Sequence, residues 1–307
     1  MDSAALSASA PDGYRSGFVA LIGRPNVGKS TLMNQLVGTK LAITSPLAQT
    51  TRNRLRGILT TDRAQLVLVD TPGIHKPHHL LGERLVKAAR AAASAVNLVL
   101  LLMDGSKPAG RGDGFIVELL KGCRVPVLVA LNKQDLVKPA CAPALQAGYQ
   151  ALIGDCPSFP ISATTARGCQ ALLEAMVGQL PPGPYLYPPD LVSDQPERLL
   201  MAELIREQVL HHTHAEIPHS VAVSIEQVLE EKTRTCVLAT VLVERNSQKR
   251  ILIGKGGSML GTIGRGARLQ LQKLIDGKVY LEIFVKVAPH WRRNPVKLAE
   301  LGYGEEM

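Results

Sequence analysis

Short runs of apolar residues alternate with segments of helical spacing through the first half of the chain. Four runs are each short enough to be a buried strand, at residues 18–22, 65–69, 98–103 and 125–131. Segments such as 113–121 and 168–179 repeat their apolar residues with the period of a helix. Strands that alternate with helices are typical of a parallel sheet covered by helices. The pattern therefore predicts an α/β domain over residues 17–180, with a mostly parallel sheet flanked by helices.

This alternation stops at a proline-rich segment. Residues 181–189 contain five prolines, which cannot continue a helix or join the interior of a sheet. Residues 181–196 are therefore predicted to form a semi-rigid linker, followed by a second domain over residues 197–307 that begins with a helix. Residues 1–16 lack the basic start and apolar core of a secretory signal, and they are predicted to be a disordered tail.

A phosphate-binding loop follows the first apolar run. The string GRPNVGKS lies between a predicted strand and a segment of helical spacing, which is the context that such a loop requires. Glycines permit backbone angles and close approaches that a β-carbon would block, so successive N–H groups can point at phosphates. Lys29 is predicted to reach the β- and γ-phosphates, and the Ser30 hydroxyl to bind Mg²⁺. The residues of this loop predicted to bind nucleotide are Gly23, Arg24, Pro25, Asn26, Val27, Gly28, Lys29 and Ser30.

A second element follows the apolar run at 65–69. Its first residue, Asp70, comes at the carboxyl end of a strand, where ligands of open α/β sheets bind. Asp70 is predicted to hold Mg²⁺, and the Gly73 N–H to sense the γ-phosphate and to lose that contact after hydrolysis. The stretch predicted to contact GTP comprises Asp70, Thr71, Pro72, Gly73 and Ile74.

Two later motifs indicate that the base is guanine. Asp135 of Asn132-Lys133-Gln134-Asp135 can accept hydrogen bonds from the N1–H and the exocyclic amine of guanine, neither of which adenine offers in that place. Lys133 is predicted to lie over the base, and Asn132 to brace the loops. Ser162 and Ala163 match the last element, whose backbone N–H contacts the guanine O6. The series predicts a GTPase that transfers a phosphoryl group to water.

The first switch is the least distinctive element. Between the loop helix and the strand before Asp70 lies Gln49-Thr50-Thr51-Arg52-Asn53, and one of its threonines is expected to reach Mg²⁺ and the γ-phosphate. We favour Thr51; the alternative is a polar loop that carries no ligand. The residues assigned to catalysis are Asn26, Lys29, Thr51, Asp70 and Gly73.

Positive charge is concentrated in one part of the second domain. The chain has a net charge of +9, and residues 245–297 contain twelve Lys or Arg against Asp276 and Glu282, a local balance of +10. A basic block within a folded domain favours a polyanion such as RNA as partner. A solvated basic face without a polyanionic partner and an anionic membrane surface are the alternatives that charge alone leaves open.

A Gly-rich loop within this block strengthens the case for RNA. Gly254-Lys255-Gly256-Gly257 lies between two helical segments, which is typical of the nucleic-acid clamp of KH domains. Paired glycines let a phosphate backbone approach the loop N–H groups, while Lys255 supplies charge. The residues predicted to bind RNA are Lys249, Arg250, Ile253, Gly254, Lys255, Gly256, Gly257, Arg265 and Arg268.

Stretches in both halves resemble the Era family of bacterial GTPases, which carry a C-terminal type-2 KH domain. They include GRPNVGKSTLMNQLVG, VDTPGIHKP, LNKQDLV, RLLMAELIREQVL and IGKGGSMLGTIG. The similarity extends from Gly17 to Tyr303, and the pairing of these two domains in this order is specific to the family. The resemblance implies an α/β P-loop GTPase domain followed by an α+β type-2 KH domain.

The resemblance also implies a function. Era proteins assist assembly of the small ribosomal subunit, and their KH domain binds single-stranded RNA near the 3′ end of 16S rRNA. The GTP-bound form would bind RNA, and hydrolysis to GDP would release it. Family members also occur partly at the inner membrane surface, and the basic block is consistent with such peripheral contact.

Activation of water is an open point in this comparison. Ile74 stands where related GTPases carry a water-orienting Gln, and its hydrocarbon side chain cannot hydrogen-bond the attacking water. Slow intrinsic hydrolysis is therefore expected, with charge stabilisation supplied from elsewhere. Asn26 matches a position that coordinates K⁺ in a cation-activated subset, so K⁺ is a candidate cofactor beside Mg²⁺; RNA is the other candidate activator.

Two alternative functions are weighed against this GTPase switch. One is an RNA-binding module whose GTPase half is only structural, and the intact Lys29, Ser30 and Asp70 argue against it. The other is a GTPase acting at membranes, with the basic block serving phospholipid. Five cysteines without CxxC spacing indicate thiols kept reduced in a cytosol, so a cytoplasmic protein is expected. Nothing in the sequence requires more than a monomer.

Overall fold

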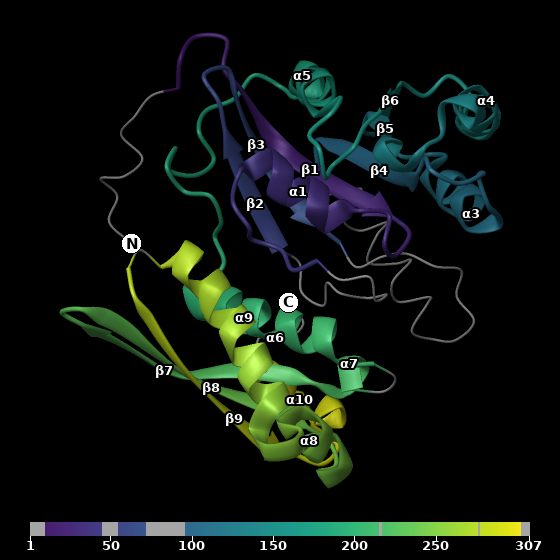
Figure 1. The fold of residues 1–307 in the computed structure, drawn as a ribbon. Helices are drawn as coiled ribbons and strands as arrows, with labels where there is room; N and C mark the ends of the chain where they lie inside the picture. The colour runs from purple at the N-terminus through teal and green to yellow at the C-terminus, as the bar shows by residue number, and fades with distance from the viewer. Residues whose placement is uncertain (1–9, 45–54, 72–95, 215–216, 276, 302–307) are drawn as a thin grey trace. The chain divides into compact units, whose positions relative to one another are not determined.

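The chain forms two compact units, which are described separately. The computed structural model describes residues 10–44, 55–71, 96–214, 217–275 and 277–301. Unit 1 comprises Met1–Ala42 and Arg54–Asp194, and unit 2 comprises Ile43–Asn53 and Gln195–Met307 (Figure 1).

Unit 1 is built on a six-stranded sheet with the strand order β2-β3-β1-β4-β5-β6. The strands are β1 (Arg15–Gly23), β2 (Leu55–Thr60), β3 (Ala64–Asp70), β4 (Leu98–Asp104), β5 (Val127–Asn132) and β6 (Ser158–Pro160). All neighbours pair in parallel except β2 and β3, which a short turn joins as an antiparallel hairpin. The predicted α/β architecture with a mostly parallel sheet is confirmed.

Helices cover both faces of this sheet. They are α1 (Lys29–Val37), α3 (Arg111–Leu120), α4 (Ala142–Ile153) and α5 (Cys169–Gln179), with short 3₁₀ turns η2 (Gln134–Leu136) and η3 (Pro139–Cys141). Alternate residues of β1 enter different cores: Val19 packs in the core that contains α1 and α5, and Ala20 in the core that contains α3 and α4. This two-sided burial explains why the central strands are apolar without alternation.

Both the start and the end of the described part of unit 1 pack against its sheet. Tyr14 is only 3% exposed, and β1 begins at Arg15, within the stretch expected to be a disordered tail. At the other end, the proline-rich segment, which was predicted to be a semi-rigid linker, belongs to unit 1 and is hydrogen-bonded to its sheet. The buried side chain of Gln65 on β3 accepts hydrogen bonds from the backbone N–H groups of Leu186 and Tyr187, at 2.7 and 2.9 Å.

Unit 2 has an α+β fold with a three-stranded sheet in the order β7-β8-β9. Its elements are α6 (Glu197–His212), α7 (Ile217–Ser220), β7 (Ala222–Glu231), β8 (Arg234–Val243), α8 (Asn246–Ile253), η4 (Lys255–Gly257), α9 (Ser258–Leu274), β9 (Val279–Val287), η5 (Trp291–Arg293) and α10 (Pro295–Glu300). Strand β8 pairs antiparallel with β7 and parallel with β9. Helices α6, α8 and α9 share one core with the inner face of this sheet (Figure 1).

One residue of the unit 2 core comes from far away in the sequence. Ile43 follows α1 but is buried among residues of α6, α9 and the second sheet. Thr44 beside it donates from its backbone N–H to a carboxylate oxygen of Glu207, at 2.7 Å. The chain therefore contributes to unit 2 before it returns to unit 1 to form β2.

Candidate functional site

The phosphate loop connects the end of β1 to the start of α1, as predicted. A β-carbon on Gly23 would lie 2.4 Å from the carbonyl oxygen of Leu102, and one on Gly28 would lie 2.3 Å from Nδ2 of Asn132. Gly28 also has a left-handed φ of 100°. The residue that precedes α1, Gly28, has no side chain to cap the helix, so the first N–H groups of α1 are directed toward the loop, where an anion is stabilised.

Lys29 is almost completely buried in this loop. Its Nζ donates to the carbonyl oxygens of Gly23 and Arg24, at 3.3 and 3.1 Å. Burial lowers the pKa of the Lys29 amine, and the carboxylate of Asp70 offsets part of that effect. An anionic phosphate beside the amine would favour its charged form in the same way.

Ser30 and Asp70 bring two oxygen ligands together. The Ser30 hydroxyl donates to Oδ2 of Asp70 at 2.7 Å, and Asp70 is fully buried at the end of β3. The next residue, Thr71, donates its hydroxyl to the carbonyl oxygen of Leu21 at 2.7 Å, which fixes the strand end. A hydroxyl and a carboxylate in contact form a donor set that suits a hard cation such as Mg²⁺.

Asn132 joins three loops that are distant in sequence. Its Nδ2 donates to the carbonyl oxygen of Val27 at 2.8 Å, and its Oδ1 accepts from the N–H of Ala163 at 2.9 Å. The hydroxyl of Ser162 in turn donates to Oδ1 of Asp135 at 2.6 Å. The predicted phosphate and base elements therefore lie at one edge of the sheet.

Two acidic residues that were not among the predicted site residues also lie at this edge of the sheet. Asp104, at the end of β4, is 2.8 Å from Nζ of Lys133. Asp113, near the start of α3, is 3.2 Å from the guanidinium of Arg24 in the phosphate loop. The sequence could have indicated Asp104 as a site residue, because it ends an apolar strand in the way that Asp70 does. The sequence could not have indicated Asp113, because a helix commonly has an acidic first turn.

Four of the predicted nucleotide contacts are not placed. Thr51, Pro72, Gly73 and Ile74 lie outside the described residues.

The Gly-rich loop of unit 2 connects α8 to α9. Gly254, Gly256 and Gly257 have φ values of 72°, 59° and 80°, which favour glycine over residues that carry a β-carbon. Four of the basic residues predicted to bind RNA are exposed, and Lys249 and Ile253 are half-buried; the exposed ones are Arg250, Lys255, Arg265 and Arg268.

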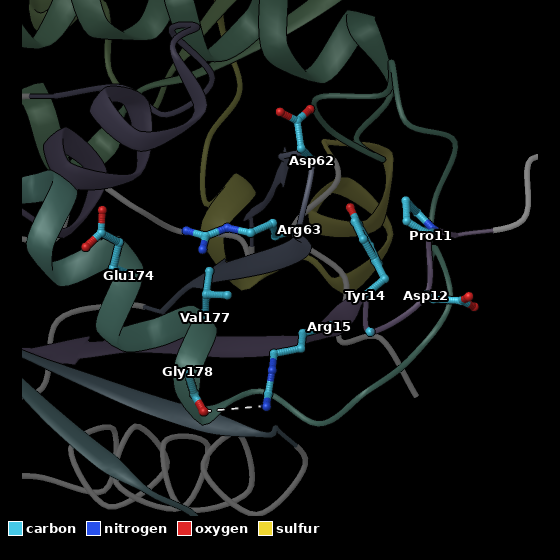
Figure 2. A pocket seen from close by; sticks show the side chains of 10 residues that line it. Pro11, Asp12, Tyr14, Arg15, Asp62, Arg63, Glu174, Val177 and Gly178 are labelled. Atoms are coloured by element: carbon cyan, nitrogen blue, oxygen red, sulfur yellow. Dashed lines mark hydrogen bonds between the residues drawn. The ribbon is translucent and has the colours of Figure 1, made fainter.

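A cavity of about 440 Å³ lies elsewhere in unit 1 (Figure 2). Its walls come from the start of β1, from the turn between β2 and β3 at Asp62 and Arg63, and from the last turns of α5. Arg15 in this wall donates to the carbonyl oxygens of Gly178 and Leu180 and so caps the end of α5. The cavity is at the opposite end of β1 from Gly23, and no predicted nucleotide residue lines it.

Among the described residues, no helix combines the length and the apolar character needed to cross a membrane.

Comparison with known proteins matches the two units to two families. Residues 18–133 match a family described as a 50S ribosome-binding GTPase, and residues 216–292 match the KH domain. Proteins called GTPase Era are similar over almost the whole chain. That of Synechocystis sp. is 58% identical over 299 residues, which are 97% of this chain and 95% of the relative. That of Nostoc sp. is 59% identical over 299 residues, with coverages of 97% and 92%.

Solved structures show the same similarity. A crystal structure of Era in complex with MgGDPNP and nucleotides 1506–1542 of 16S ribosomal RNA has a TM-score of 0.87 and 36% identity. The match covers 95% of this chain and 99% of that one. A variant of Aquifex aeolicus Era bound to GDP.AlF4⁻ also has a TM-score of 0.87, with 35% identity and coverages of 94% and 99%.

Proposed function

Because this chain belongs to the Era family of GTPases, we propose that it couples GTP hydrolysis to binding of the 3′ region of 16S rRNA during assembly of the small ribosomal subunit. The protein is a GTPase with an α/β P-loop domain and a C-terminal KH domain. The main support for the proposal is that similarity to Era proteins extends over both units. In unit 1 the predicted nucleotide loops lie together, and unit 2 contains the Gly-rich loop at residues 254–257, called the glycine clamp below.

In the proposed site, the loop residues position the phosphates. Lys29 would contact the β- and γ-phosphates, and Ser30 and Asp70 would hold Mg²⁺. When bound, Mg²⁺ neutralises charge that develops on the transferred phosphoryl group. The Era structure with MgGDPNP supports this cofactor. Thr51 and Gly73 are proposed to contact the γ-phosphate and to respond to its loss.

The base is proposed to be read by three loop residues. Asp135 accepts hydrogen bonds from the guanine N1–H and the exocyclic amine, Lys133 lies over the ring, and the Ala163 N–H contacts O6. Asn132 holds their loops to the phosphate loop through the contacts described above. Adenine would cover the Asp135 carboxylate without offering it a donor, which is costly, so the site selects guanine.

K⁺ is proposed as a second cation at Asn26. Its backbone has a left-handed φ of 62° within the phosphate loop. Since Ile74 cannot orient water, a monovalent cation near the phosphates would supply part of the missing charge stabilisation. Equal hydrolysis rates in K⁺ and Na⁺ buffers would remove this part of the proposal.

The glycine clamp is proposed to bind single-stranded RNA. Gly256 and Gly257 have no β-carbon that would keep a phosphate chain away from the loop backbone, and they lie next to the exposed Lys255. The Era complex with nucleotides 1506–1542 favours 16S rRNA, whereas the family description of the GTPase domain names the 50S subunit. We favour 16S because the Era match covers the RNA-binding unit, which the 50S-named match at residues 18–133 does not reach. We place the protein in the cytoplasm, with the basic block as the surface for peripheral contact with the inner membrane.

The test is single-turnover GTP hydrolysis in K⁺ buffer, with RNA matching the 3′ region of 16S rRNA or a 23S rRNA fragment of equal length. We expect acceleration by the 16S fragment only, lost when Gly256 and Gly257 are both changed to Asp. Gln227→Asp with Thr233→Asp is the control, because it adds the same charge at exposed positions of unit 2 away from the loop. Equal loss of this acceleration in both double variants would count against a specific clamp. Equal binding of phospholipid vesicles and RNA by the wild type, measured separately, would also count against it.

A further inference from the structure

The carboxylate of Asp104 is fixed beside the loop that carries Lys133. Asp104 ends β4 and is paired in register with Asn132, the residue before Lys133. The N–H of the next residue, Gly105, donates to the carbonyl oxygen of Asn132 at 2.8 Å. Strand pairing therefore sets the separation of the Asp104 and Lys133 backbones independently of either side chain.

Other contacts restrict the orientation of this carboxylate. Its Oδ1 accepts from the hydroxyl and the N–H of Ser106, at 2.5 and 3.2 Å, and its Oδ2 accepts from Nζ of Lys133 at 2.8 Å. The backbone carbonyl of Asp104 also accepts from the hydroxyl of Tyr149 at 2.7 Å. One oxygen is thus held by the turn, and the other is directed at the lysine.

Asp104 stays ionised in this position. Burial by itself raises the pKa of Asp104, but the hydrogen bonds from Lys133 and Ser106 outweigh it and hold the pKa below its usual range.

The ammonium of Lys133 is therefore anchored at the far end of a long side chain. Its backbone is also constrained, with a left-handed φ of 66°. A lysine stem fixed at both ends can offer one constant apolar surface to a planar base, whereas a lysine with a free end must be ordered when the ligand binds.

We propose that Asp104 is a positioning residue for guanine recognition, acting through Lys133 without touching the nucleotide. The inference rests on the proposed placement of Lys133 over the base. Its consequence is specific: Asp104 contributes to the affinity for every guanine nucleotide equally, because GDP and GTP share the base, and it contributes nothing to phosphoryl transfer.

The test is a double-mutant cycle on the full chain, with Asp104→Asn, Lys133→Met and the double variant. Asn keeps an acceptor for Ser106 but offers Lys133 no charge. We expect Asp104→Asn to raise the Kd of GDP and of GTP by the same factor, about three- to tenfold, the cost of ordering one long side chain. The kcat at saturating GTP should not change. In the Lys133→Met background, Asp104→Asn should have no further effect on either Kd.

A matched control is available in the same unit. Asp194 forms an ion pair with Arg56 at the same separation, 2.8 Å, and its side chain is 17% exposed against 19% for Asp104. Asp194→Asn should leave both Kd values unchanged. Thermal unfolding of all variants separates a loss of affinity from a loss of folded protein.

Ser106→Ala provides a second route if Asp104→Asn does not fold. It removes one hydrogen bond that orients the carboxylate and should give a smaller rise in both Kd values. Additive effects in the cycle, or a changed kcat with unchanged Kd, would overturn the inference while leaving the proposed function intact. No effect of Lys133→Met on either Kd would overturn both the inference and the proposed role of Lys133.

Discussion

At the scale of single residues, the proposed nucleotide site depends on the buried amide of Asn132, which is hydrogen-bonded through both its nitrogen and its oxygen. Asn132 is 2% exposed, and its amide donates to one loop and accepts from another. Its Nδ2 lies where a β-carbon on Gly28 would be, so that glycine is required both for its φ and for space. Such pairings matter because a buried polar group without a partner costs about 1–3 kcal/mol.

The ionised state of Asp104 predicts how its contribution to stability depends on pH. A carboxyl whose pKa is lower in the folded than in the unfolded protein stabilises the fold above its unfolded pKa. That contribution is lost as the pH falls from the ordinary value of 3.8 through the lowered one. We expect wild type to have a higher Tm than Asp104→Asn near neutral pH and the difference to shrink below pH 3.8. Calorimetry of both proteins across this range checks it; a difference that grows on acidification would contradict the assigned pKa shift.

At the scale of elements, unit 2 is held together by the close packing of α6 and α9. Helix α9 buries Ile263, Ala267 and Leu271 on one face, which is the spacing of a helix stripe directed at a core. Gly266 of α9 lets α6 approach closely: a β-carbon on Gly266 would lie 2.2 Å from Oε1 of Gln208 on α6. A glycine in mid-helix is normally unfavourable, so its presence here is explained by packing.

A pair of glycine substitutions in α9 tests this packing. A β-carbon on Gly261 would meet no heavy atom within 4 Å, so Gly261→Ala should stabilise unit 2 by about 0.5–1 kcal/mol. Gly266→Ala gains the same helix propensity but must displace the buried Gln208 side chain, so it should be less stable than Gly261→Ala by about 1 kcal/mol or more. Urea unfolding followed by the fluorescence of Trp291, the chain's one tryptophan, measures both. Equal gains in the two variants would show that Gln208 moves without cost.

At the scale of the whole molecule, the order of the chain and the division into units do not coincide. Ile43 is 3% exposed in the core of unit 2, and Thr44 donates from its N–H and its hydroxyl to the fully buried carboxylate of Glu207, at 2.7 and 3.2 Å. The predicted first switch, residues 49–53, therefore lies in the chain between residues anchored in unit 2 and β2 of unit 1. The chain itself therefore connects the predicted first switch to unit 2, and the proposed coupling of nucleotide state to RNA binding can use this covalent connection.

Truncation of Ile43 should consequently lower the stability of unit 2, most of which is distant from Ile43 in the sequence. Ile43→Ala removes buried methyl groups and should lower the stability of unit 2 by about 2–4 kcal/mol. The transition seen by Trp291 fluorescence should move to lower urea, because Trp291 is buried in unit 2. Ile58→Ala is the control, since Ile58 is equally buried, at 2% exposure, but belongs to unit 1. Equal shifts of the Trp291 transition in both variants would contradict the assignment of Ile43 to unit 2.

The sequence by itself determined the elements whose cause is local. Apolar runs predicted the central strands because both faces of each are buried, and helices α3 and α5 begin and end within two residues of their predicted limits. The phosphate loop and the Gly-rich loop of unit 2 could be predicted because their backbone angles and close approaches favour glycine at fixed positions. The guanine motifs of the first domain, followed by the Gly-rich loop of the second, gave the resemblance that identified the family.

Only the tertiary structure decided which residues meet across the fold. The Asp104–Lys133 contact follows from the register of β4 against β5, and the Asp113–Arg24 contact from the packing of α3 beside the phosphate loop. Ile43 looks like any apolar residue after a helix, and nothing near it in sequence indicates which core it fills. The proline-rich segment was predicted to be a linker because composition does not reveal Gln65, whose buried amide fixes it to the sheet. Periodicity and glycine spacing act within a few residues, whereas register and core membership depend on partners far along the chain.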